Sequence, residues 1–233
     1  MKILYTDTAP LADPRLWERA LACSLASRRK YALAYRFPKD QRLSIAAGLL
    51  LSRLMLDEGL APEKAGIRFS HSVKPEMPGH PGWHFNLAHS GRIAVCMLGD
   101  YPCGVDVETE SSFEDYDPAH ILTYRELMQV EGLPDRARPP LVARFWARKE
   151  AFLKCLGIGL SLEPRNLSTV PSIHVPMRDG SRFALRDYRL EGHALAACLP
   201  DGIPFPELES IAMEALVASL EPDRAKQEQA EHA

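Results

Sequence analysis

Two acidic segments combine carboxylates with lysines at spacings that suit phosphate chemistry. The first is 104–108 (G-V-D-V-E), where the alternation of side chains along a strand places Asp106 and Glu108 on one face. Residues two apart lie roughly 6.5–7 Å apart along a strand, so both carboxylates can reach one ion. Mg²⁺ prefers such oxygen ligands and also binds substrate phosphates. An edge strand with a solvated acidic face would show the same short pattern.

The second segment predicts a helix that carries a third carboxylate. Apolar residues recur at helical spacing over 141–156 and form one broad face. Glu150 lies at the border of this face and Lys154 follows one turn later, so the two are neighbours. Lys149 falls inside the apolar face. The alternative interpretation is a surface pair of Glu150 and Lys154, with Lys149 extending its ammonium to solvent.

Together the two segments resemble the 4′-phosphopantetheinyl transferases, in particular the larger, surfactin-synthetase-activating type. Two further motifs carry the resemblance: 85–91 (F-N-L-A-H-S-G), in which Ala88 replaces a serine, and the Lys74–Pro75 pair before it. The four motifs occur in the family's order and fall within residues 28 to 165. The resemblance implies an α+β fold built from two similar α/β halves in pseudo-twofold arrangement within one chain.

The family's activity sets the functional expectation. The resemblance implies transfer of the 4′-phosphopantetheine arm of coenzyme A to a serine of an apo acyl- or peptidyl-carrier protein, with release of adenosine 3′,5′-bisphosphate. Coenzyme A would be the co-substrate, and Mg²⁺, or Mn²⁺ in its place, would be the metal. A monomer is expected because one chain contains both halves.

Roles for individual residues follow from the same resemblance. Asp106, Glu108 and Glu150 would hold the metal ion, and Glu150 and Lys154 would be catalytic. The residues expected to bind coenzyme A are Lys30, Arg42, Lys74, His89, Ser90 and Lys149. The base that takes the serine proton stays open between Glu150, Glu126 and a metal-bound water.

A basic cluster supplies the expected site for the 3′-phosphate of coenzyme A. Residues 28–30 (R-R-K) and Arg42 precede or open a helix, where clustered cations can bind a phosphate. The family usually has an arginine directly before a serine or threonine, whereas this chain reads R-L-S over 42–44. Arg42 is therefore one residue out of that register. A solvated helix entrance is the alternative.

Other functions use similar residues. A Mg²⁺-dependent nuclease or phosphatase could also employ three carboxylates, but it would hydrolyse its substrate without a protein acceptor. A binding module with a decayed site is disfavoured because the three acidic residues and both lysines are present. A packed, hydrogen-bonded histidine is the commoner fate of a histidine after an apolar strand, but the resemblance favours a functional role for His89.

Composition limits the cellular setting. The net charge of −3 over 233 residues gives no basic surface that would favour nucleic acid as a partner. No apolar run approaches the length of a membrane span, and the N-terminus does not resemble a secretory signal. Five cysteines without a C-x-x-C pair indicate reduced thiols. We therefore expect a cytoplasmic protein.

The expected elements alternate between strands and helices. We expect strands over 1–5, 93–98, 104–108, 182–190 and 194–199, and helices near 13–27, 39–58, 119–130 and 141–156. The similar strands 93–98 and 194–199 suggest two related halves. The predicted division is residues 1–104, residues 105–220 and a polar tail over 221–233.

Overall fold

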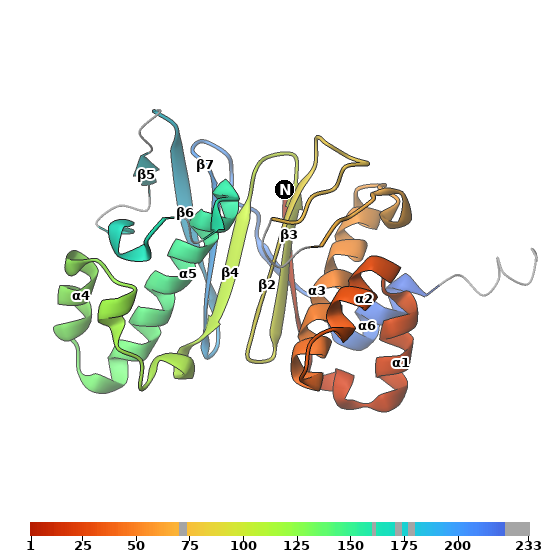
Figure 1. Cartoon of the computed structure of the whole chain (residues 1–233), viewed down its shortest axis with the longest axis horizontal. Helices are drawn as coiled ribbons and strands as arrows, with labels where there is room; N and C mark the ends of the chain where they lie inside the picture. Colours follow the sequence, from red (N-terminus) through yellow and green to blue (C-terminus); the bar gives the residue numbers. More distant parts are fainter. Residues whose placement is uncertain (70–73, 160–161, 171–173, 177–179, 222–233) are drawn as a thin grey trace, which may run out of the picture.

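Two sheets lie face to face between two groups of helices (Figure 1). The computed structural model describes residues 1–69, 74–159, 162–170, 174–176 and 180–221. The first sheet has the order β2-β3-β1-β8 and the second the order β4-β7-β6-β5. The strands are β1 (Lys2–Asp7), β2 (His84–Ser90), β3 (Ile93–Gly99), β4 (Gly104–Thr109), β5 (His174–Pro176), β6 (Arg182–Leu190), β7 (His193–Pro200) and β8 (Leu208–Ser210). The predicted α+β class, with two similar halves, is confirmed.

The helices cover the outer faces of the two sheets (Figure 1). Those beside the first sheet are α1 (Pro14–Cys23), α2 (Ala26–Leu33), α3 (Pro38–Asp57) and α6 (Met213–Leu220), and those beside the second are α4 (Tyr124–Glu131) and α5 (Arg138–Leu156). The prediction of one helix near 13–27 was wrong, because the backbone of Ser24 is extended. The Ser24 hydroxyl donates to the Ala20 carbonyl and closes α1, and α2 then begins at Ala26.

The strand sequences explain how three cores form. In β3, Ala94, Cys96 and Leu98 face the helices of the first half, whereas Ile93, Val95 and Met97 face the second sheet. β7 divides its residues in the same way between its own helices and the core between the sheets. Period-2 alternation therefore builds both layers from strands that are apolar throughout.

The same alternation orients the acidic strand. Val105 and Val107 of β4 lie in the core between the sheets, so Asp106 and Glu108 take the face toward α5. Gly104 allows α5 to approach closely, since a Cβ there would collide with the Ala151 carbonyl oxygen and the Cys155 amide nitrogen. A larger residue at Gly104 would push α5, and the site residues it carries, away from the strand.

The end of the chain returns to the first half. β8 pairs in parallel with β1, with Ile3 opposite Leu208. α6 buries Met213, Leu216 and Val217 in the core of the first half. The division of the chain into domains 1–104 and 105–220 stays a prediction. β8 and α6, which fall in the second of these ranges, pack with the first sheet.

Other expectations concern the tail, the membrane and the thiols. Residues 222–233 of the polar tail lie outside the described residues. In the part of the chain that the structure describes, no helix is long and apolar enough to cross a membrane. The thiols of Cys23, Cys96, Cys103, Cys155 and Cys198 are free, as the cysteine spacing predicted.

Candidate active site

The predicted carboxylates lie at a seam between the two halves. β2 and β4 are edge strands of different sheets, and in the described ladders neither pairs with the other. Side chains join them instead: the Asn86 Oδ1 atom accepts a hydrogen bond from the Val105 amide at 2.9 Å. Asn86 is buried and also lines the cavity at this seam. Sequence reasoning gave it no role, although it lies inside the 85–91 motif.

Asp106 is the deepest of the three carboxylates, with 4% of its surface exposed. Its Oδ1 atom lies 2.5 Å from the Lys154 Nζ atom, whereas its buried Oδ2 atom has no hydrogen-bond partner. Burial raises the pKa of Asp106, and the charge of Lys154 only partly opposes this. An unpartnered carboxylate oxygen in a buried position is costly, so this atom is suited to receive a cation or a donor from a ligand.

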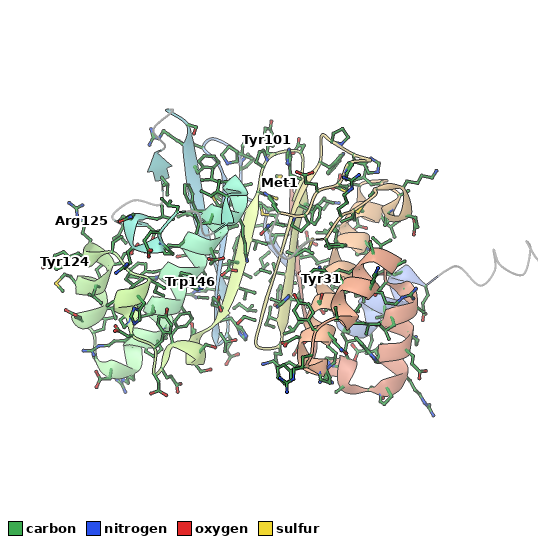
Figure 2. All side chains as sticks on the ribbon, viewed as in Figure 1. Met1, Tyr31, Tyr101, Tyr124, Arg125 and Trp146 are labelled. Atoms are coloured by element: carbon green, nitrogen blue, oxygen red, sulfur yellow. The ribbon has the colours of Figure 1, made fainter. Side chains whose placement is uncertain are left out.

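Glu108 is held by two donors. Its Oε1 atom accepts from the Trp146 indole nitrogen at 3.1 Å, and its Oε2 atom accepts from the Ser90 hydroxyl at 3.2 Å. Burial, followed by the nearby charge of Asp106, raises the pKa of Glu108 to about 7. Trp146 on α5 and Tyr31 on α2 are labelled on the two sides of the seam in Figure 2. Ser90, predicted to bind coenzyme A, contacts Glu108 in this structure and does not line the described cavities.

Glu150 and Lys154 complete the charged group from α5. The helix is regular to Leu156 and ends at Gly157, whose φ of 70° is left-handed. Burial raises the pKa of Glu150, and Asp106 adds to the effect. Burial would lower the pKa of Lys154, but Asp106, Glu150 and Glu108 together raise it. The ammonium of Lys154 therefore lies in the combined field of all three carboxylates and stays charged.

The three carboxylates are gathered but not pre-aligned as a metal cage. Across the described residues, no three His, Cys, Asp or Glu side chains already stand in an arrangement that could hold a metal ion. The donor set itself is all carboxylate oxygen, the chemistry that Mg²⁺ selects. With the unpartnered Oδ2 of Asp106, the residues fit a hard divalent cation that keeps several waters.

A cavity of about 540 Å³ opens beside these residues. Its polar lining comes from both halves and comprises Arg28, Tyr31, Tyr35, Lys74, Asn86, His89, Glu150 and Lys154. Burial, then the charges of Arg28 and Lys154, lowers the pKa of His89 to about 4, so the imidazole is neutral at physiological pH. Lys74 donates to the carbonyls of Cys103 and Cys155 at 3.0 and 3.3 Å, which anchors it at the cavity wall.

Arg28 is the cation of the basic cluster that faces this cavity. It is 5% exposed, and its Nε atom donates to the Ser44 carbonyl at 2.8 Å. Its guanidinium lies over the Phe69 ring at 4.7 Å and the Tyr31 ring at 5.3 Å. Burial lowers its pKa to about 10, which leaves it charged. The helical spacing of Arg28, Tyr31 and Tyr35 is the sequence signal that could have identified it.

Lys30 and Arg42 do not take the predicted places. Lys30 is exposed on α2 and Arg42 is half-buried on α3, and neither lines the cavity. Lys30 lies two positions after Arg28 on the helix, a step that turns a side chain by about 200°. The role of Lys30 therefore stays a prediction, and Arg28 is the residue of the cluster that the structure places at the cavity.

Lys149 is a core residue, and its predicted contact with coenzyme A was wrong. Its ammonium is fully buried and lies 2.7 Å from Glu126 Oε2, and it also donates to the carbonyls of Ile121 and Pro164. With three acceptors in place, this ammonium is not available to a ligand. Lys154, one turn further along α5, is the lysine that lines the cavity.

Glu126 belongs to the same buried pair. Its two oxygens also accept hydrogen bonds from the amides and hydroxyls of Thr123 and Thr169. Burial alone would raise its pKa, but the hydrogen bonds from Lys149 and these two residues outweigh burial and lower it. A carboxylate with this many donors is a poor proton acceptor, so the structure argues against Glu126 as the base.

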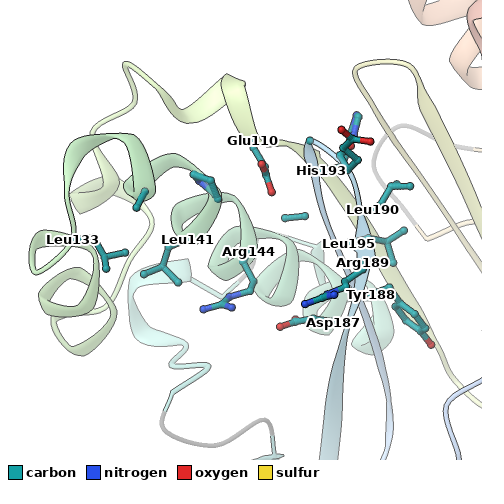
Figure 3. A pocket seen from close by; sticks show the side chains of 15 residues that line it. Glu110, Leu133, Leu141, Arg144, Asp187, Tyr188, Arg189, Leu190, His193 and Leu195 are labelled. Atoms are coloured by element: carbon teal, nitrogen blue, oxygen red, sulfur yellow. The ribbon is translucent and has the colours of Figure 1, made fainter.

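A larger cavity lies elsewhere, beside the first turns of α5 (Figure 3). It measures about 980 Å³ and lies between the first turns of α5 and the turn that joins β6 and β7. Glu110, Arg144, Arg189 and Glu191 give it mixed charge. None of the predicted site residues lines it, so size alone does not identify the functional cavity.

Comparisons with known proteins identify similar sequences. Residues 102–199, which include β4 and α5, match the model of the 4′-phosphopantetheinyl transferase superfamily. The resemblance that the sequence motifs predicted is therefore confirmed. It is 26% identical over 220 residues to the 4′-phosphopantetheinyl transferase Sfp of Bacillus subtilis, a match that covers 89% of this chain and 95% of the relative.

Two further proteins are similar to this chain or to part of it. The 4′-phosphopantetheinyl transferase HetI of a Nostoc species is 26% identical over 198 residues, which cover 81% of this chain and 83% of the relative. A solved holo-(acyl-carrier-protein) synthase from Bacillus anthracis, in complex with coenzyme A (3′,5′-ADP), has a TM-score of 0.35 and 21% identity. That match covers 43% of this chain and 95% of the synthase.

Proposed function

We propose that this enzyme transfers the 4′-phosphopantetheine arm of coenzyme A to a serine hydroxyl of an apo acyl- or peptidyl-carrier protein. In this reaction the serine oxygen forms a bond to the phosphorus that carries the pantetheine arm. The bond from that phosphorus to the bridging oxygen of the pyrophosphate breaks, and adenosine 3′,5′-bisphosphate leaves. The observation that carries the proposal is the gathering of Asp106, Glu108 and Glu150 around Lys154. The cavity beside them is also lined by the cationic side chains of Arg28 and Lys74.

The cavity offers separate positions for the charged parts of coenzyme A. Arg28 is a buried, charged guanidinium suited to the 3′-phosphate, because it is held by Ser44 and two aromatic rings before any ligand binds. Lys74 and the neutral His89 can bind other phosphate oxygens. Lys154 is suited to the pyrophosphate, where its charge would oppose the charge that develops on the leaving phosphate.

Asp106, Glu108 and Glu150 would hold the Mg²⁺ ion. When bound, the ion would neutralise phosphate charge next to these carboxylates. Asp106 supports this assignment through its unpartnered Oδ2 atom, and Glu150 through its place in the cavity wall. The raised pKa of Glu150 also suits it to accept the serine proton, which we propose as its second role.

Transfer can be tested directly by mass. The protein is incubated with coenzyme A, Mg²⁺ and a panel of apo acyl- and peptidyl-carrier proteins, and each carrier is analysed by intact mass spectrometry. We expect one phosphopantetheine group to be added to at least one carrier, and none when its acceptor serine is replaced by alanine. Hydrolysis of coenzyme A without any carrier modification would instead indicate a hydrolase.

The cellular setting and the oligomeric state belong to the same proposal. We infer a cytoplasmic enzyme, supported by five free thiols in the described residues. We also infer a monomer, because both sides of the seam come from one chain. A single species of about 26 kDa in light scattering would support this, and a stable dimer would contradict it.

A further inference from the structure

Glu108 differs from the other site carboxylates in how it is held. One donor reaches each of its oxygens, and the donors come from different halves of the molecule: Ser90 ends β2, and Trp146 lies on α5. Asp106, in contrast, accepts from Lys154 at Oδ1, and its Oδ2 atom has no hydrogen-bond partner. Among the three carboxylates, Glu108 is the one that accepts a hydrogen bond from an uncharged donor at each of its two oxygens.

Each donor is itself oriented by its surroundings. The Ser90 hydroxyl oxygen accepts a hydrogen bond from the Thr109 amide at 3.1 Å, so its proton is directed to Glu108 or to the Thr109 hydroxyl, 3.2 Å away. Trp146 packs against the core of the second half, and its indole nitrogen can only donate. The indole nitrogen therefore holds the Oε1 atom of Glu108 as an acceptor, and the Ser90 hydroxyl lies at the Oε2 atom.

We propose that Trp146 and Ser90 are positioning residues, which fix the carboxylate of Glu108 in the orientation needed to bind the divalent ion beside Asp106 and Glu150. The inference rests on the proposed function, because it takes Glu108 as a metal ligand. Hydrogen-bond donors behind a ligating side chain commonly set its orientation, and their removal weakens metal binding by about 10- to 100-fold.

The arrangement also connects the seam to the metal. Because Ser90 lies on β2 and Trp146 on α5, both oxygens of Glu108 have a donor only when β2 and α5 are both packed against β4. Displacement of either half would release one oxygen. The metal site is thus completed by the closure of the two halves and not by the second half alone.

Trp146→Phe is the principal variant, since it keeps an aromatic ring and removes the donor. Trp17→Phe is the matched control, because Trp17 packs against the core of the first half and lies on α1. Ser90→Ala removes the other donor, and Ser90→Thr retains a hydroxyl. Mn²⁺ binding is measured by the electron paramagnetic resonance signal of free Mn²⁺, alongside the Mg²⁺ dependence of transfer. Melting curves in EDTA report whether each variant is folded.

The expected result is a Mn²⁺ dissociation constant raised at least about 10-fold in Trp146→Phe and in Ser90→Ala. Trp17→Phe and Ser90→Thr should stay within about twofold of the unmodified protein, and the two donor variants should melt as folded proteins. Unchanged Mn²⁺ binding in folded Trp146→Phe would overturn the inference. Equal weakening in Trp146→Phe and Trp17→Phe would also overturn it, since general packing would then be the cause.

The proposed function fails in a different way. If the unmodified protein binds Mn²⁺ and Trp146→Phe weakens it, but no carrier is modified, the role of Trp146 stands and the transfer reaction does not. If the unmodified protein modifies carriers yet binds no Mn²⁺, Glu108 is not a metal ligand, and the inference is overturned while the transfer activity remains.

Discussion

The two halves of the molecule share a strand arrangement but differ in chemistry. β3 lies between β2 and β1 in the first sheet, and β7 lies between β6 and β4 in the second. The ladders match residue for residue: His89 is opposite Ala94 in the first half, and Arg189 is opposite Ala194 in the second. α3 and α5 cover the corresponding faces. The halves therefore repeat one framework around a pseudo-twofold axis.

The acidic strand β4 and its counterpart β1 carry different side chains at matching positions. Glu108 is opposite Ala194 and Asp106 is opposite Ala196, and the corresponding positions in β1 are Thr6, opposite Ala94, and Leu4, opposite Cys96. The first half therefore has no carboxylate pair on this strand. The comparison shows that a repeated framework provides two seams, but only the one beside β4 contains the charged groups.

The second seam is occupied by the chain itself. Residues before β8 run along β6, where Tyr188 donates to the Pro206 carbonyl at 2.8 Å and Arg186 donates to Glu207 at 3.0 Å. β8 then joins the edge of β1. The first seam keeps an open cavity, and the second is closed by backbone and surface ion pairs.

The largest effect should come from the acidic strand. Glu108→Gln should lower the rate of phosphopantetheine transfer by at least about 10³-fold, because a charged group next to the reacting phosphates is lost. Thr6→Val, at the matching position of the first half, should leave the rate within about twofold. Intact-mass time courses with an apo carrier measure both. Comparable losses in the two variants would show that the halves are not functionally distinct.

The buried ion pair should dominate stability. α5 buries the charged Lys149, whereas α3 buries no charged side chain. Lys149→Met should lower the free energy of unfolding by about 3–5 kcal/mol, because Glu126 keeps a buried charge without its partner. Urea unfolding at neutral pH measures this change. The double variant Glu126→Gln/Lys149→Met should lose less than the single one, and a greater loss would contradict a charge-based explanation.

The third prediction concerns acid stability and His89. Because the folded protein holds the pKa of His89 near 4, below its ordinary value of 6.5, the unfolded chain binds the proton more readily between these values. Stability should therefore fall as the pH drops from 6.5 to 4. His89→Gln removes this component. As the pH falls from 7.5 to 4.5, the free energy of unfolding of this variant should therefore rise by about 1–3 kcal/mol relative to that of the unmodified protein. Parallel pH profiles from urea unfolding would rule the explanation out.

The smallest effects should distinguish the two seams. Asn86→Ala should lower the free energy of unfolding by about 1–3 kcal/mol, because it leaves the buried Val105 amide without its partner. Arg186→Ala, at the matching position of β6, should cost less than about 1 kcal/mol, since Glu207 is largely exposed. Thermal unfolding measures both variants, and a larger loss from Arg186→Ala would reverse the comparison.

Much of the framework could be predicted from local sequence. Period-2 alternation placed Asp106 and Glu108 on one face of a strand, and helical spacing placed Glu150 one turn from Lys154, as the structure shows. These features depend on short-range geometry. The same kind of reasoning missed the break at Ser24 and the short elements β8 and α6, whose formation depends on pairing with β1 and packing against α3.

The site was harder to predict from the sequence than the framework. A lysine in an apolar helical face can be a ligand or half of a buried ion pair, and only the distant residue Glu126 decides which. The choice between Lys30 and Arg28 likewise depends on Gly48, where the absence of a side chain lets the stem of Arg28 pass across α3. Such outcomes need contacts between segments far apart in the chain.

The sequence by itself determined which residues carry the charge and on which face of each element they lie, because strand and helix periodicity act within a few residues. The tertiary structure decided which charged groups meet. It directed Lys149 into the core, directed Arg28 into the cavity and gave Glu108 a donor from each half. The physical reason is that burial and ion pairing are properties of the packed faces, and the packing of these faces is a long-range outcome of the whole fold.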